Sequence, residues 1–68
     1  MANNIRYLRR AALLSQKELA AMIGLTQGAV SHWEKGRTNP RTDELPKIAA
    51  ALGCTINDLI DHKEGTAQ

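Results

Sequence analysis

The sequence lacks several features that would assign it to common structural classes. It has one cysteine, Cys54, so it can form no internal disulfide, and a lone thiol fits a reducing cytoplasm. It has no phenylalanine, one tyrosine and one tryptophan, so Leu, Ile and Ala must supply most of the core. No apolar run approaches the ~20 residues of a membrane span, and charges follow the N-terminus too soon for a signal peptide. We therefore expect a small cytoplasmic domain.

Helix start and stop signals divide the sequence into five short segments. Ser15 and Glu18 have the spacing of a capping box, in which each side chain accepts a hydrogen bond from the other residue's backbone N–H group. Gly24 and Gly53 can adopt the positive φ that ends a helix, and no segment alternates apolar and polar residues as a strand does. We therefore expect an all-α fold, a compact domain of five helices. The helices are expected from a cap at Asn3 or Asn4 to about Leu13, between Ser15 and Gly24, from a cap at Thr26 to Gly36, from a start between Thr42 and Pro46 to Gly53, and after a cap at Thr55.

Apolar residues at helical spacing indicate the buried face of each segment. In the first segment Ile5, Leu8 and Ala12 share one face. The end of the sequence is polar and has no such face. We expect one domain over residues 1–61 and a polar, disordered tail over residues 62–68.

The charges are divided unevenly along the chain. Residues 1–41 carry seven basic and two acidic side chains, a net charge of +5, whereas residues 42–68 carry two basic and five acidic ones, a net charge of −3. A basic half of this kind suggests that a polyanion binds on that side of the molecule. The alternative is that these side chains form an ordinary solvated surface.

The most informative segment runs from residue 16 to residue 35. Two helices that pack steeply across a three-residue turn need a small residue where they approach, here Ala20, and a glycine at the turn, here Gly24. The remaining positions of the pattern must be apolar to pack together, and here they are Leu19, Ile23, Leu25, Val30 and Trp33. A plain helical hairpin would share the apolar spacing, but the joint match at all seven positions favours a DNA-binding helix-turn-helix.

The sequence also resembles the phage repressor and Cro family of helix-turn-helix proteins. The resemblance rests on Ser-Gln-Lys-Glu-Leu-Ala at residues 15–20, on Thr-Gln-Gly-Ala-Val-Ser-His-Trp-Glu-Lys-Gly-Arg-Thr-Asn-Pro at residues 26–40, and on Leu-Pro-Lys-Ile-Ala-Ala-Ala-Leu-Gly at residues 45–53. It covers residues 3–60. It implies a repressor-like five-helix fold, dimeric binding to a DNA operator, and regulation of transcription.

One segment departs from the family pattern. The family often ends its first helix with a glycine shortly before the Ser-Gln pair, where this sequence has Ala12, Leu13 and Leu14. A non-glycine residue in a left-handed cap costs roughly 1 kcal/mol. Either the chain carries that strain or the first helix ends in another way, which affects the start of the second helix.

The third helix is the expected recognition helix, with its first residues at the base edges of the major groove. Because Val30 and Trp33 face inward, the opposite side of the helix is free to contact DNA. The predicted base-contacting residues are Gln27, Gly28, Ser31 and His32. Gln27 can pair with adenine N6 and N7, and His32 can donate to guanine, whereas Gly28 lets the backbone approach the groove.

Polar and basic residues around the two helices are expected to contact the DNA phosphates. These residues are Gln16, Lys17, Lys35, Arg37, Asn39 and Arg41. The family resemblance also pairs an arginine of the first helix with the glutamate that ends the recognition helix. In this sequence these are Arg9 and Glu34, which implies a structural ion pair. Arg6 and Arg10 are expected to be exposed, where they can approach the DNA backbone.

The expected partner is a double-stranded, palindromic DNA operator, bound by a weak homodimer. The end of the fourth helix and the fifth helix, with Ile56, Leu59 and Ile60, are expected to form the dimer contact. No membrane, cofactor or metal is expected, and no enzyme activity, because Cys54 and the histidines form no cluster along the sequence. The alternative is an antitoxin-type regulator that binds both DNA and a partner protein.

Overall fold

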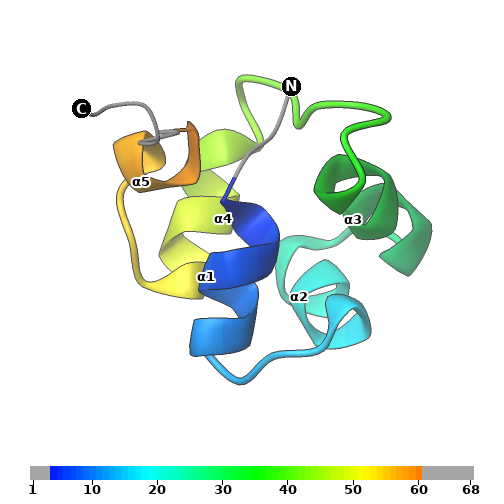
Figure 1. The fold of residues 1–68 in the computed structure, drawn as a ribbon, viewed down its shortest axis with the longest axis horizontal. Helices are drawn as coiled ribbons and strands as arrows, with labels where there is room; N and C mark the ends of the chain where they lie inside the picture. Colours follow the sequence, from blue (N-terminus) through cyan, green and yellow to red (C-terminus); the bar gives the residue numbers. More distant parts are fainter. Residues whose placement is uncertain (1–3, 61–68) are drawn as a thin grey trace.

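The computed structural model describes residues 4–60, which form five helices and no strand (Figure 1). The helices are α1 (Ile5–Ala11), α2 (Gln16–Ile23), α3 (Gln27–Glu34), α4 (Leu45–Leu52) and α5 (Ile56–Ile60). The predicted all-α, five-helix class is confirmed. The tail predicted over residues 62–68 lies outside the described residues. None of the described helices is long and apolar enough to cross a bilayer.

A single apolar core joins the five helices. Helix α2 packs mainly on α3 and on α4, and α4 in turn packs on α5. Each helix contributes at least one residue to the core, which consists of Ile5, Leu19, Ala20, Ile23, Val30, Trp33, Ile48, Ala49, Leu52 and Leu59. Trp33, the only tryptophan, is among them. The predicted Leu, Ile and Ala supply the rest of the core, together with one valine, Val30.

The predicted caps of α2, α3 and α5 are present. The Ser15 hydroxyl accepts from the Glu18 backbone N–H at 2.9 Å, and the Glu18 carboxylate accepts from the Ser15 N–H at 2.8 Å. Thr26 accepts from the backbone N–H of α3's third residue at 3.2 Å, and Thr55 forms a reciprocal pair with Asp58. These bonds satisfy N–H groups that the first turn of a helix leaves free.

Helix α1 ends two residues earlier than predicted, at Ala11. The backbone N–H of Leu13 donates to Arg10 O at 3.0 Å, and that of Leu14 donates to Arg9 O at 3.1 Å. These two bonds form a Schellman cap, which requires a left-handed residue between helix and turn. Leu13 is that residue, with φ +62°, so the chain carries the strain at the position where a glycine was expected.

Three local expectations were wrong. Ala12 lies beyond the end of α1 and is exposed. Asn4 precedes α1 without capping it through its side chain; instead its amide donates to Asp58 O at 2.8 Å and its backbone N–H donates to Leu59 O at 2.9 Å. These bonds satisfy carbonyls at the end of α5 and tie the beginning of the fold to its end. Leu25 is 36% exposed and is neither part of the core nor among the residues packed against it.

Replacing Leu13 by glycine is expected to stabilise the protein. The Leu13 side chain is 89% exposed and contributes little packing, whereas its φ carries strain that glycine does not. After subtraction of the extra chain entropy that glycine loses on folding, we expect a gain of about 0.5–1 kcal/mol in the free energy of unfolding. Urea unfolding followed by circular dichroism measures it.

Leu13→Ala is the matched control, because it removes the same exposed side chain and keeps a Cβ at positive φ. It should leave the free energy of unfolding close to that of the original protein. An equal gain from alanine and glycine would mean that the exposed leucine, and not the backbone, is the destabilising feature.

Candidate nucleic-acid interface

Helices α2 and α3 form the helix-turn-helix that the sequence pattern predicts. Gly24 is left-handed, with φ +77°, and ends α2. The next residue, Leu25, donates its backbone N–H to Ala20 O at 2.9 Å, which closes the turn. Ala20 is buried where the two helices approach each other. Thr26 then starts α3, whose inner face holds Val30 and Trp33.

The residues predicted to contact bases occupy the outer side of α3. Gln27, Gly28 and His32 are exposed and Ser31 is half-buried. A Cβ added to Gly28 would meet only the Thr26 hydroxyl oxygen, at 3.9 Å, so the fold itself does not demand glycine there. The absence of a side chain leaves a low point on the outer side of the helix. The contacts of these four residues with bases stay predictions.

The residues predicted to contact phosphates flank α3 on two sides. Gln16 and Lys17 open α2, whereas Lys35, Arg37, Asn39 and Arg41 follow the end of α3. All are exposed except the half-buried Gln16. The Arg41 guanidinium lies 4.0 Å from the carboxylate of Asp43, and because both groups are exposed, that pair is weak and leaves the arginine available.

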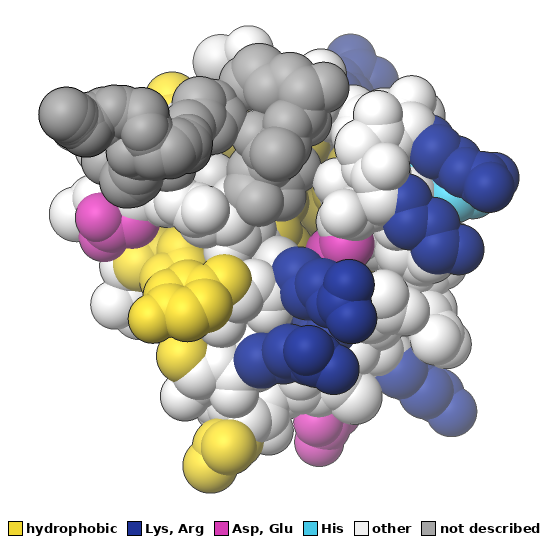
Figure 2. All heavy atoms as spheres, in the orientation of Figure 1, with side chains coloured by type: hydrophobic (Ala, Val, Ile, Leu, Met, Phe, Trp, Pro, Cys, Tyr) yellow, Lys and Arg dark blue, Asp and Glu magenta, His cyan; other side chains and the backbone are white. Residues whose placement is uncertain are grey.

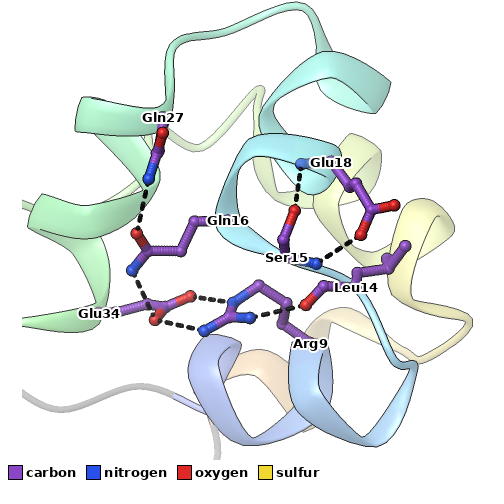
Figure 3. A network of polar contacts seen from close by, with 7 residues as sticks. All are labelled: Arg9, Leu14, Ser15, Gln16, Glu18, Gln27 and Glu34. Atoms are coloured by element: carbon purple, nitrogen blue, oxygen red, sulfur yellow. Dashed lines mark hydrogen bonds and ion pairs between the residues drawn. The ribbon is translucent and has the colours of Figure 1, made fainter.

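A polar network connects the core to the outer side of α3 (Figure 3). The Arg9 guanidinium donates to both carboxylate oxygens of Glu34, through Nε at 2.6 Å and Nη2 at 3.1 Å, and through Nη1 to Leu14 O at 2.6 Å. The Gln16 amide donates to Glu34 Oε1 at 3.1 Å, and its carbonyl oxygen accepts from Gln27 Nε2 at 3.5 Å. We call Arg9, Glu34, Gln16 and Gln27 the polar network.

The carboxylate of Glu34 is ionised in this setting. Its side chain is only 4% exposed. Burial alone raises the pKa of Glu34, but hydrogen bonds from Arg9 and Gln16, with the positive charges of Arg9 and Arg6, outweigh it and hold that pKa below the ordinary value. The hydrogen bond to Glu34 likewise raises the pKa of Arg9. The family resemblance implied this pairing, and the two side chains do form it.

The bridging position of Gln16 was not anticipated from the sequence. Gln16 was expected only to contact a phosphate, yet it lies between Glu34 and Gln27. A carboxylate can only accept hydrogen bonds, so Gln16 must turn its NH₂ group toward Glu34 and its carbonyl toward Gln27. These partners stand 18 and 11 residues away along the chain. No local spacing signals such an arrangement, which depends on how α2 packs against α3.

The positive surface charge lies on the side of the molecule that holds the helix-turn-helix. In Figure 2, Lys and Arg side chains gather on the side that holds α2 and α3 and across the middle of the face, whereas hydrophobic side chains gather on the opposite side, below α5. Within residues 4–60 no group of three or more His, Cys, Asp or Glu side chains could hold a metal ion. Burial raises the pKa of the Cys54 thiol, which disfavours the reactive thiolate.

Helices α2 and α3 meet across a tight turn, and α3 is capped at its start and exposed on its outer side, with basic residues around it. These features place the protein in the class of helix-turn-helix proteins. The chain belongs to the helix-turn-helix family, whose sequence model matches residues 5–59.

Similar proteins include phage and chromosomal regulators. Repressor protein C2 of Salmonella phage P22 is 32% identical over 60 residues, which cover 88% of this chain and 28% of the repressor. The uncharacterised HTH-type transcriptional regulator y4dJ of Sinorhizobium fredii is 35% identical over 66 residues, 97% of this chain and 86% of that protein. The chain spans half or less of the length of several curated relatives that it matches.

A solved structure agrees with the same grouping. The P22 c2 repressor in complex with a synthetic operator matches with a TM-score of 0.79 and 32% identity, over 84% of this chain and 86% of that chain. The fold and the family are therefore shown by sequence and structure together.

The polar network predicts a specific acid sensitivity. The folded-state pKa of Glu34 lies below its unfolded value. Its contribution to stability is therefore complete above about pH 4.3, the ordinary glutamate pKa, and is lost as pH falls through the lower folded value. Urea unfolding between pH 7 and pH 3 should show this loss.

Glu34→Gln supplies the control, since the amide keeps the size of the side chain and does not titrate. Its unfolding free energy should be lower at pH 7 and should fall less steeply below pH 4.3. Parallel curves for the two proteins would show that other carboxylates cause the acid sensitivity.

Proposed function

We propose that the chain binds double-stranded DNA in a sequence-specific way through α3 and represses transcription from a palindromic operator. One observation carries this proposal above the others: Gln27 stands exposed at the first turn of α3, with its amide held by a network that begins at a buried ion pair. This contact, at 3.5 Å the long limit for a hydrogen bond, favours one orientation of the amide toward a base edge. The similarity to a repressor whose structure includes its operator supports the same conclusion.

The direction of each hydrogen bond in the network suggests which base Gln27 prefers. Gln27 uses one N–H of its amide on Gln16. It keeps one N–H and its carbonyl oxygen for a ligand. A donor beside an acceptor matches adenine, whose N7 accepts and whose N6 donates in the major groove. We therefore propose adenine as the base that Gln27 reads in each half-site.

We further propose that two copies bind the operator together. A single recognition helix contacts few base pairs. Two copies related by a two-fold axis double the number of base pairs that are recognised on a palindrome. On α5, Leu59 is buried in the core, but Ile56 is 37% and Ile60 43% exposed. These two isoleucines, one helical turn apart, offer a small apolar contact for a second copy, which suits a weak dimer.

Selection of bound sites from random duplexes tests the function, and a palindromic consensus is the expected outcome. Gln27→Ala should then lower the preference for adenine at one position of each half-site, by ~1–3 kcal/mol in binding free energy. Competition between duplexes that differ only at that position measures the change.

Lys17→Ala is the control for base reading, because a phosphate contact carries no sequence information. It should weaken binding to all duplexes by the same factor. Uniform weakening by Gln27→Ala as well would remove Gln27 from the base readers.

The proposed dimer contact is tested by Ile60→Ser. Each copy that loses the partly exposed isoleucine should lower the free energy of the contact between the two copies by about 1 kcal/mol. Binding of the second copy to a palindromic duplex should therefore weaken. Sedimentation of protein–duplex mixtures gives the number of bound copies. Met22→Ser, which changes another exposed apolar residue on α2, should leave that number at two; an effect of equal size would place the contact elsewhere.

A further inference from the structure

Helix α1 carries two arginines whose guanidinium donors are not taken up by the fold. Arg6 and Arg10 are exposed, one helical turn apart. Within residues 4–60, neither has an ion pair or a side-chain hydrogen bond. Two like charges at this spacing repel each other by ~0.2–0.5 kcal/mol. Arg6 also lies in the first turn of α1, where the helix dipole disfavours a cation. The charge of Arg6 helps to keep Glu34 ionised, but the fold does not explain why a second arginine stands beside it.

The two arginines border a shared surface groove. The groove has a volume of about 540 Å³ and is lined by Arg6, Tyr7, Arg10, Ala11 and Glu34. Glu34 is its only acidic residue, and the carboxylate already accepts three hydrogen bonds, two from Arg9 and one from Gln16. The charge of Arg6 favours the ionised form of Glu34, but within the described part of the chain no hydrogen bond or ion pair joins Glu34 to Arg6 or Arg10, so both exposed guanidinium groups keep their donors for an anion from outside.

The position of the groove indicates which anion fits. Its Glu34 wall is the same carboxylate that orients Gln16, so the groove adjoins the start of α2 and the end of α3 (Figure 3). Figure 2 shows Lys and Arg side chains in the middle of the face, beside those on the side of α2 and α3. Gln16, which is predicted to contact a phosphate, therefore lies beside the groove.

We propose that Arg6 and Arg10 form a phosphate-binding site on α1 that contacts the DNA backbone outside the helix-turn-helix. The site rests on the proposed DNA-binding function and extends it. Guanidinium groups bind phosphate oxygens through paired, charge-assisted hydrogen bonds, for which both arginines have free donors. Since such contacts are made to the backbone, they add affinity and salt dependence without selecting a base.

The test compares salt dependence in three proteins on the selected operator duplex. Each phosphate contact contributes a slope of about −0.9 to log K against log salt, so the Arg6→Gln, Arg10→Gln double variant should have a slope shallower by about 1.8. The ratio of the original protein's affinity to that of the double variant should then fall about twelvefold between 50 and 200 mM salt. The preferred sequence should not change. Lys47→Gln, which removes an exposed cation on α4 beside Met22 and Gly24, should keep the original slope.

Duplexes with one neutral methylphosphonate then locate the contact. At one or two positions the neutral linkage should weaken the original protein and leave the double variant unaffected. An unchanged slope in the double variant, an equal change in Lys47→Gln, or an altered sequence preference would overturn the α1 site while DNA binding stands. If the original protein binds no duplex, the proposed function and this site fall together.

Discussion

The ion pair between Arg9 and Glu34 is the interaction on which the rest of the structure depends. Arg9 joins three elements, because its guanidinium binds the last residue of α3 and the Leu14 carbonyl in the α1–α2 turn. A buried charge without its partner destabilises a protein by about 3–5 kcal/mol, a large share of what a domain of this size has available. The strained cap at Leu13 fits this requirement, since it brings the Leu14 carbonyl within reach of Arg9.

The same ion pair extends order from the core to the surface. Glu34 accepts from Gln16, and Gln16 accepts from Gln27, so each group determines which end of the next amide can face it. Exposed glutamines normally lose considerable side-chain entropy when they bind a ligand. In this molecule the 3.5 Å contact with Gln16 favours one orientation of the Gln27 amide before binding. A mobile polar side chain thus becomes a directional one, at the position proposed to read a base.

How much could be predicted from the sequence depended on how local the cause was. The capping box at Ser15 and the left-handed glycine at Gly24 were predictable, because their partners lie within a few residues. The bond from Asn4 to α5 spans 54 residues and overrode the local expectation of a helix cap. The place of Gln16 in the polar network could not be predicted either, because its partners are 18 and 11 residues away along the chain. The seven-position pattern predicted the helix-turn-helix because tertiary packing itself imposes that spacing.

The small apolar contact proposed on α5 has a consequence for regulation. Ile56 and Ile60 bury too little area to hold two free copies together strongly. On a palindrome, however, the first bound copy raises the effective concentration of α5 for the second, so even a weak contact acts within the complex. In the proposed complex, operator occupancy therefore depends on the square of the concentration of free protein. Because the DNA brings the two copies together, operator occupancy responds steeply to protein concentration even though the contact between the copies is small.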